Sequence, residues 1–302
     1  MTVDPLAWLQ QDVIGGPNVA SWTNPLHPGY AYPEAAGLLI RWMAQRDRLP
    51  PTAVLESLVD AVQRDAVGRA GITYAFDTGV VLTGLDAVVP DDPRWTAARS
   101  RLAERLRARA VTTPTVAPRW STTPGPHMLK LAVGTLVRAR RGAATPLRDV
   151  LAAWPFEQRD DGLLHTPPHA ATYLHAHAYA TEGLLALAQL GVDTANAAAI
   201  AIDALARMQS PDGSLPAWSD GTVPGRCDTT AQAVRLFILH DRERLRGAIE
   251  TGLAFLDRHT DERGATAYEA GSDDRNTWTT LFTAQARAWA RDEAGACVEG
   301  LL

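Results

Sequence analysis

Apolar residues recur through most of the chain with the 3.6-residue period of an α-helix, and alternating β-branched runs are scarce. Six stretches are apolar almost all the way round, which is typical of helices enclosed by other parts of a protein. They cover residues 30–44, 74–88, 120–137, 173–190, 227–239 and 276–290. Six further stretches have one charged face, as surface helices do, and cover residues 4–13, 51–66, 93–110, 145–154, 193–208 and 242–259. The pattern predicts an all-α protein in which inner and outer helices alternate.

The entrances to the apolar stretches recur about every 43–52 residues, a spacing that indicates a repeat architecture. An open solenoid of stacked hairpins fits this period. A closed ring fits it too, and six inner and six outer helices match the chain length without a remainder. We therefore expect an (α/α)6 toroid, a six-hairpin barrel, as one domain over residues 1–302.

In such a ring the inner helices run parallel, so their N-termini open at the same end and their entrance loops line one funnel. The positive ends of the helix dipoles would favour an anionic ligand there. The run Arg226–Thr230, which opens one inner helix, is the most polar of these entrances. We expect Arg226 to neutralise a carboxylate on the substrate.

Three carboxylates stand at predicted helix starts: Glu34, Asp77 and Asp228. The ordinary role of such a residue is to complement the helix dipole or to cap the first turn. Three of them on one rim would also supply a general acid and a base. We expect Asp228 or Asp77 to be the acid, with Glu34 as a further catalytic candidate.

The stretch "YLHAHAYATEGLL" carries two histidines beside tyrosines. Helical spacing places Tyr173 and His177 on one face and His175 with Tyr179 on the next. These residues could all be packing between inner and outer helices. A histidine beside a tyrosine also suits proton transfer at a sugar carbon, so His175 or His177 is our candidate base.

Aromatic residues cluster near the same entrances, where their faces would pack against sugar C–H groups or stabilise a carbocation. The candidates for substrate binding, with Asn276, are Trp22, Tyr30, Tyr32, Tyr74, Trp120, Tyr173, Tyr179, Trp218 and Trp278.

Composition narrows the classes of partner. The formal net charge is −5 and basic runs are missing, which argues against nucleic acid. The sequence has no run of 18 consecutive apolar residues, so we expect no membrane span. It shows no signal-peptide pattern, and its only cysteines are Cys227 and Cys297, so we expect a cytoplasmic protein. Cofactors are not expected, although a zinc ion held by Cys227 with His175 and His177 is an alternative. The expected partner is a small-molecule substrate, and the oligomeric state stays open.

Two resemblances accompany these patterns. The run "MQSPDGSL" resembles the Gln-x-x-Asp-Gly-Ser-Trp repeat of squalene cyclase and protein prenyltransferase β-subunit folds, with Leu215 in place of the Trp. The following "RCDTTA" stands where class II terpene cyclases carry Asp-x-Asp-Asp-Thr-Ala, which implies Asp228 as protonating acid, with Arg226 and Thr229 replacing its flanking carboxylates. The stretches "FDTG" and "YLHAHAY" are similar to those of α/α-toroid carbohydrate epimerases, lyases and unsaturated-uronyl hydrolases.

The sequence thus favours an enzyme that acts in a central funnel on a sugar or other polyhydroxylated small molecule. The expected reaction is acid–base chemistry, either epimerisation or elimination. One alternative is a class II terpene-cyclase-like enzyme in a dry, apolar cavity, with Asp228 as the acid. A second alternative is a toroid that binds a small molecule without catalysis.

Overall fold

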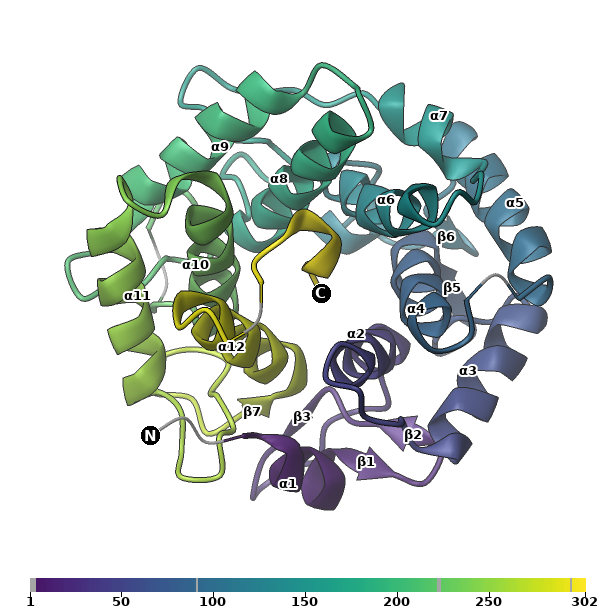
Figure 1. Ribbon diagram of the computed structural model, residues 1–302, viewed down its shortest axis with the longest axis horizontal. Helices are drawn as coiled ribbons and strands as arrows, with labels where there is room; N and C mark the ends of the chain where they lie inside the picture. Colours follow the sequence, from purple (N-terminus) through teal and green to yellow (C-terminus); the bar gives the residue numbers. More distant parts are fainter. Residues whose placement is uncertain (1–3, 91, 222–223, 294) are drawn as a thin grey trace.

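The computed structural model describes residues 4–90, 92–221, 224–293 and 295–302. Two concentric rings of helices make up this part of the chain (Figure 1). The inner ring consists of α2 (Pro33–Ala44), α4 (Ala75–Val88), the 3-10 segment Pro126–Leu131 with α6 (Ala132–Arg140), α8 (Leu174–Gln189), α10 (Cys227–Asp241) and α12 (Thr277–Ala290). The outer ring consists of α3 (Thr52–Gln63), α5 (Arg94–Arg107), α7 (Leu147–Ala152), α9 (Ala195–Met208), α11 (Arg246–Arg258) and α1 (Leu6–Trp8) with the π-helical turn Leu9–Val13. The predicted all-α toroid is confirmed.

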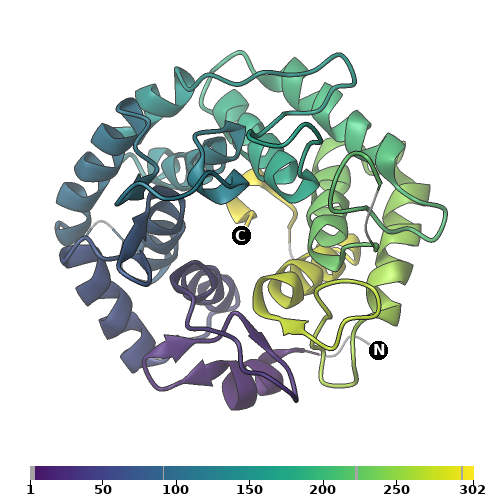
Figure 2. The ribbon, with the colours of Figure 1, turned by 180° about the vertical axis from the view of Figure 1, so that it is seen from behind.

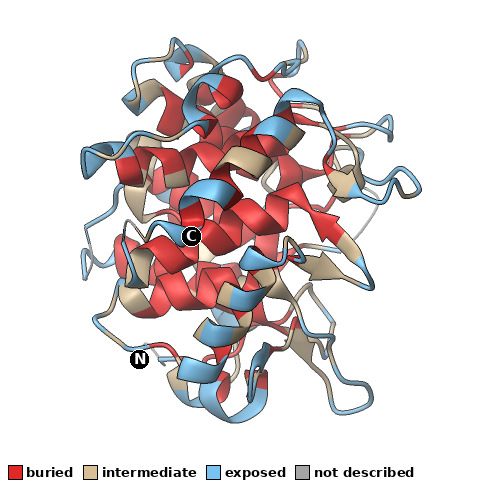
Figure 3. Ribbon diagram, turned by 90° about the vertical axis from the view of Figure 1, so that its right-hand side faces the viewer, coloured by how far each residue is buried: buried red, intermediate tan, exposed pale blue. Residues whose placement is uncertain are grey.

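The burial of each ring follows from its sequence pattern. The outer helix α5 buries Trp95, Ala98, Leu102 and Leu106, which recur every three or four residues on one face. The inner helices are buried on nearly all sides, as Figure 3 shows for the middle of the ring. One cluster of buried hydrophobic side chains runs through all the hairpins. The extent of a single domain over the whole chain stays a prediction.

Helices α2 and α4 pack unusually closely because glycines lie at their contact. A Cβ atom on Gly37 would lie 2.9 Å from the Cα atom of Val81, and one on Gly84 would lie 2.4 Å from the carbonyl oxygen of Gly37. Any larger residue at these positions would push the two helices apart. This contact holds the middle of α2 against the middle of α4.

Short antiparallel strands, which the sequence analysis did not predict, connect the loops that lead into the inner helices (Figure 2). Strand β1 (Ile14–Gly15) pairs with β2 (Asn18–Val19), and β4 (Gly68–Arg69), β5 (Ile72–Tyr74) and β6 (Thr112–Thr113) form one sheet. Strand β3 (Trp22–Thr23) pairs with β7 (Arg275–Asn276) and so joins the first hairpin to the last. The ring is closed at this seam.

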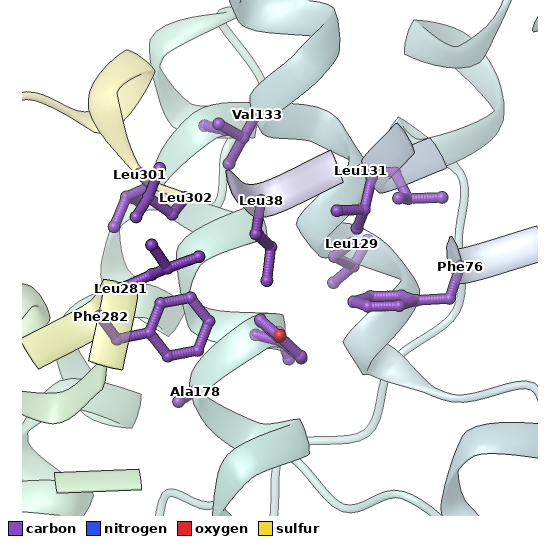
Figure 4. Close-up of a cluster of buried hydrophobic side chains, with 14 of the residues drawn as sticks. Leu38, Phe76, Leu129, Leu131, Val133, Ala178, Leu281, Phe282, Leu301 and Leu302 are labelled. Atoms are coloured by element: carbon purple, nitrogen blue, oxygen red, sulfur yellow. The ribbon is translucent and has the colours of Figure 1, made fainter. Parts of the chain in front are cut away.

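The last residues of the chain fill one end of the bore. Leu301 and Leu302 are buried and lie beside inner-helix side chains in the centre of the ring (Figures 1 and 4). Lys130 donates hydrogen bonds to Glu182 and to the main-chain oxygen of Leu302, and Arg235 Nη2 donates to Glu182 Oε1 at 2.7 Å. These contacts pair the buried charges at this end. No helix within the described ranges is both long and apolar enough to cross a membrane.

Candidate active site

A cavity of about 360 Å³ lies where the loops enter the inner helices, at the end of the bore away from Leu302. All six inner-helix entrances contribute to its wall, so the expected common funnel exists. Its lining consists of Trp22, Tyr30, Tyr32, Glu34, Arg69, Arg119, Trp120, Ser121, Tyr173, His175, Asp228, Tyr268, Asp274, Asn276 and Trp278. The sequence analysis named most of these side chains but did not name Arg69, Arg119, Ser121, Tyr268 or Asp274.

Aromatic rings form much of the wall in edge-to-face contact. Tyr30 lies between Trp22 and Tyr32, with ring centroids 5.0 and 5.5 Å away, and Tyr32 is 5.7 Å from Trp278. Such a wall offers flat faces to the C–H groups of a sugar ring, with hydroxyl and N–H groups at the ring edges. Asn276 lines the same cavity, although its Oδ1 also caps α12 by accepting from the N–H of Thr279 at 3.0 Å.

A pair of buried carboxyl groups comes from the first turns of α2 and α4. Glu34 lines the cavity and accepts hydrogen bonds from the hydroxyls of Tyr32 and Tyr179, the latter at 2.9 Å. Asp77 lies behind the lining, and its Oδ2 has no hydrogen-bond partner among the described residues. Burial raises the pKa of both groups, and the nearby charge of Glu34 raises the pKa of Asp77 further, well above its usual range. The pKa of Asp77 is therefore the more strongly raised of the two, which favours its protonated form.

Arg69 is the cation nearest this pair. Its Nη1 donates to the hydroxyl of Tyr30 at 2.6 Å, and its guanidinium carbon lies 4.7 Å from the ring centre of Tyr32. The charge of Arg69 lowers the pKa of Glu34, against the larger effect of burial. The structure shows no carboxylate within ion-pair distance of Arg69 in the described ranges. This guanidinium is available to an anionic group in the cavity.

Arg226 does not have the role that the sequence suggested. Its Nε and Nη2 donate to the two carboxylate oxygens of Asp228 at 3.0 and 2.8 Å, and its guanidinium carbon lies 3.6 Å above the ring of Tyr268. Arg226 is absent from the cavity lining, and its charge is neutralised by Asp228. This pairing does not support the expectation that Arg226 binds a substrate carboxylate.

The structure also does not support the predicted role of Asp228 as a protonating acid. Burial raises its pKa, but the charges of Arg226 and His175 and the N–H of Thr229 outweigh burial, and the net pKa lies below its usual value. Asp228 is therefore ionised at neutral pH and has no proton to donate. The cavity also carries Arg69, Arg119 and Glu34, so it is not the dry apolar chamber that a terpene cyclase requires.

The two predicted histidines face opposite ways. His175 lines the cavity, and its Nδ1 lies 3.3 Å from Asp228 Oδ2, although the two are not aligned for a hydrogen bond. His177 is fully buried: its Nδ1 accepts from the N–H of Leu164 at 2.9 Å, and its Nε2 donates to the carbonyl of Ala201 at 3.1 Å. Both nitrogens of His177 are bound to main chain, so the expectation that it is a catalytic base is corrected to a packing role.

Three more aromatic candidates lie outside the lining. Tyr179 is buried beneath the cavity, where its hydroxyl binds Glu34. Tyr74 is buried beside Arg69, with its ring centre 5.0 Å from the guanidinium carbon. Trp218 packs behind Tyr173, with ring centres 4.9 Å apart. Each of them therefore contacts a residue of the wall, and their expected role in direct substrate contact is not supported by this cavity.

The alternative zinc set is not assembled. Cys227 is buried, and burial raises the pKa of its thiol far above the usual range, so the thiolate that zinc prefers is disfavoured. His177 has no free nitrogen. Across the described ranges, no three side chains of His, Cys, Asp or Glu lie close enough together to hold a metal ion.

Comparison with known proteins identifies the fold of the chain but does not assign the chain to a family. No protein-family model matches the chain, and no curated protein matches it either. Among solved structures, UGL with dGlcA-Glc-Rha-Glc has a TM-score of 0.73 at 15% identity, covering 97% of this chain and 94% of that one. The chain is an α/α toroid.

Two further solved structures have the same architecture. The unsaturated glucuronyl hydrolase of Bacillus sp. GL1 has a TM-score of 0.69 at 15% identity, covering 93% of this chain and 92% of that one. A polysaccharide lyase has a TM-score of 0.61 at 11% identity, covering 88% and 92%. At these identities the likeness establishes the fold, because one fold hosts several chemistries.

Proposed function

We propose that this chain is a hydrolase of oligosaccharides that end in an unsaturated uronic acid. The observation that carries the proposal is the pair of buried carboxyl groups Glu34 and Asp77, whose raised pKa values favour a protonated carboxyl group beside the cavity. The substrate class is suggested by the structural neighbours, which include an unsaturated glucuronyl hydrolase. Hydrolysis takes the place of the epimerisation or elimination that the sequence analysis expected.

The proposed cavity has a proton donor and a base on facing helices. Glu34 is the member of the carboxyl pair that touches the cavity, and Asp77 behind it is the member whose pKa is raised most. Across the ring, burial lowers the pKa of His175 to about 4, so this imidazole is neutral and able to accept a proton from water. The ionised Asp228 beside it would stabilise the imidazolium that forms. Tyr179, on the same helix as His175, bridges the bore to Glu34.

The charge of the cavity suits a sugar acid. Arg69 and Arg119 both line it, and Arg69 lies beside the carboxyl pair. A guanidinium can bind a carboxylate through two parallel hydrogen bonds. We expect Arg69 to hold the carboxylate of the uronic acid, with the sugar ring against Tyr30 and Tyr32.

The test is turnover of an unsaturated uronyl disaccharide, followed by the loss of the ultraviolet absorbance of its conjugated double bond. Asp77→Asn and Glu34→Gln should each lower kcat by a factor of roughly 10² to 10⁴, the usual contribution of a positioned acid or base. Asp149→Asn, which removes an exposed carboxylate on α7, is the matched control and should leave kcat unchanged. Wild-type rates in both folded cavity variants would show that the carboxyl pair is not the proton donor.

The same assay separates the other candidate functions. An eliminating enzyme would create this absorbance when it is given an intact polyuronide, whereas the proposed hydrolase removes it. A chain that binds uronyl sugars without changing the absorbance of either substrate would be the non-catalytic toroid. For the role of Arg69, Arg69→Met should raise KM for the free acid and leave KM for its methyl ester unchanged.

A further inference from the structure

The sequence contains a single lysine, and it is buried. Of the 29 lysine and arginine residues of the chain, Lys130 is the only lysine. It is 4% exposed and lies at the end of the bore that Leu302 fills. An ammonium group is a compact point charge with three donors, whereas a guanidinium is a planar fork. The one ammonium in a chain that otherwise uses arginine indicates that the shape of this group matters here, and the proposed reaction gives it no role.

A segment that we call the plug, residues 298–302, holds Lys130 from one side. Gln285 Nε2, on α12, donates to the main-chain oxygen of Gly300 at 2.7 Å, and Lys130 donates to the main-chain oxygen of Leu302. The leucine side chains of the plug belong to the hydrophobic cluster of the ring (Figure 4). Inner helices thus bind the plug through its main chain, and Lys130 is one of the side chains that do so.

Helix α8 holds Lys130 from the other side. Glu182 accepts a hydrogen bond from Lys130, and Tyr179 lies one turn earlier on the same helix. The ring centre of Tyr179 is 5.6 Å from Lys130 Nζ, a distance at which a cation is attracted to an aromatic face. At its far end the hydroxyl of Tyr179 donates to Glu34 Oε1 at 2.9 Å. One aromatic ring therefore connects the closed end of the bore to the carboxyl pair.

We propose that Lys130 is a positioning residue, which the plug and Glu182 hold against the ring of Tyr179. The hydroxyl of Tyr179, fixed in this way, orients Glu34 at the cavity. The inference rests on the proposed function, because Glu34 belongs to the carboxyl pair that would donate the proton. Lys130 does not line the cavity, so its effect on the reaction passes through the ring of Tyr179.

The charge of Lys130 also acts on Glu34. Burial raises the pKa of Glu34, and the charge of Lys130 is among the effects that lower it. The other charged or titratable groups around Glu34 are Asp77, Arg69, Tyr32 and Tyr179. Removing the charge of Lys130, or the hydrogen bond from Tyr179, should therefore raise the pKa of Glu34 further.

The first test is Lys130→Met, which removes the charge and keeps the length of the side chain. It should lower kcat for an unsaturated uronyl disaccharide by about ten- to a hundredfold with little change in KM, because small displacements of a catalytic group are costly. The limb of the kcat profile that reports loss of the proton from the carboxyl pair should move to higher pH. Tyr179→Phe should act in the same way, and the double variant should be no slower than the slower single variant.

Arg41 provides the matched control. It is a cation of similar burial, 5% exposed, and it donates to the main-chain oxygen of Glu299 in the plug. Within the described ranges the cation over the ring of Tyr179 is Lys130, so Arg41→Met should leave kcat and its pH profile unchanged. Equal losses in Arg41→Met and Lys130→Met would show that Lys130 only stabilises the closed end. That result, additive effects of Lys130→Met and Tyr179→Phe, or wild-type kcat in Lys130→Met would overturn the proposal.

A second test leaves Lys130 in place and does not depend on catalysis. Because the chain has one lysine, protein grown with lysine that is carbon-13 labelled at Cε gives a single lysine side-chain signal. Burial lowers the pKa of Lys130 to about 8, although the charge of Glu182 raises it, and Arg235 and Arg41 are the cations that face it. The signal should therefore titrate with a midpoint near pH 8.

In protein labelled in its tyrosine rings, the signal of Tyr179, assigned by its loss in Tyr179→Phe, should shift with the same midpoint. A Lys130 signal that does not titrate below its ordinary value of 10.5, or a Tyr179 signal that does not follow it, would overturn the proposal. If the wild type hydrolyses no uronyl substrate, the proposed function has failed, and this titration still decides whether Lys130 positions Tyr179.

Discussion

Three histidines buried in the inner ring should make the protein sensitive to acid. Burial lowers the pKa of His127 to about 3 and the pKa values of His175 and His177 to about 4 each. In the unfolded chain each imidazole titrates near pH 6.5. Between these values the unfolded state binds more protons than the folded state, so the free energy of unfolding falls as the pH falls.

The magnitude follows from the difference between the folded and unfolded pKa values. At pH 5 each of these histidines costs about 2 kcal/mol of stability, and the three together cost about 6 kcal/mol. Since a typical domain has about 5–15 kcal/mol in total, this loss is a large fraction of its stability. Glu34 and Asp77, with raised pKa values, act in the opposite sense, so a variant must isolate the histidine contribution.

His177→Gln is that variant. Denaturant unfolding at pH 7 and pH 5 should show that the stability lost between the two is about 2 kcal/mol smaller in the variant than in the wild type. At pH 7 the variant should be less stable by about 1–3 kcal/mol, because His177 satisfies two buried main-chain groups. Its kcat at pH 7 should be unchanged. An unaltered pH dependence, or a large fall in kcat without unfolding, would refute both the neutral state and the packing role of His177.

Three further predictions concern the packing and charge of the site. Asp77→Asn should raise the Tm at pH 8 and leave it nearly unchanged at pH 4. The reason is that the pKa of Asp77 is raised in the folded state, so the wild type loses stability as the pH rises above about 3.9, the pKa of Asp in the unfolded chain. A Tm difference independent of pH would contradict this. Arg226→Met should cost about 3–5 kcal/mol in denaturant unfolding, since it leaves Asp228 buried and unpaired, and the double variant with Asp228→Asn should recover much of that loss. Gly37→Ala should cost about 1–3 kcal/mol and lower kcat, as its Cβ would meet the main chain of Val81; full activity would show that the close contact of α2 and α4 is unnecessary.

Most of the fold could be predicted because helix periodicity is a local property. A stretch such as 74–88 is apolar on every side, so it can be stable only inside other helices, whereas 93–110 has a charged face that must remain outside. Regular alternation of the two types predicts stacked hairpins, and the match of six hairpins to the chain length favours a ring over an open solenoid. The short strands could not be predicted in this way, since β3 and β7 are two-residue segments from opposite ends of the chain.

The site was predictable where it depends on the helix entrances and not where it depends on loops or helix rotation. Glu34 and Trp278 were found because the N-termini of parallel inner helices must converge. Arg69 was missed because its position depends on the path of a loop through β4 and β5. His175 and His177 are two residues apart, so they point to nearly opposite sides of α8, and both sides of an inner helix are buried. The sequence therefore could not decide which histidine faces the cavity.

The buried carboxyl groups Glu182 and Asp77, at opposite ends of the bore, differ in how their oxygens are paired, and this difference supports the proposed place of the chemistry. At the end filled by Leu302, Lys130 and Arg235 each donate to one oxygen of Glu182, so both oxygens of this carboxylate are paired. Burial lowers the pKa of Lys130 to about 8. At the open end, Oδ2 of Asp77 has no partner among the described residues. Buried polar atoms are rarely left unpaired, because each costs about 1–3 kcal/mol. The unpaired oxygen of Asp77, behind the cavity wall at Glu34, is therefore a physical reason for the catalytic proposal to begin at this carboxyl pair.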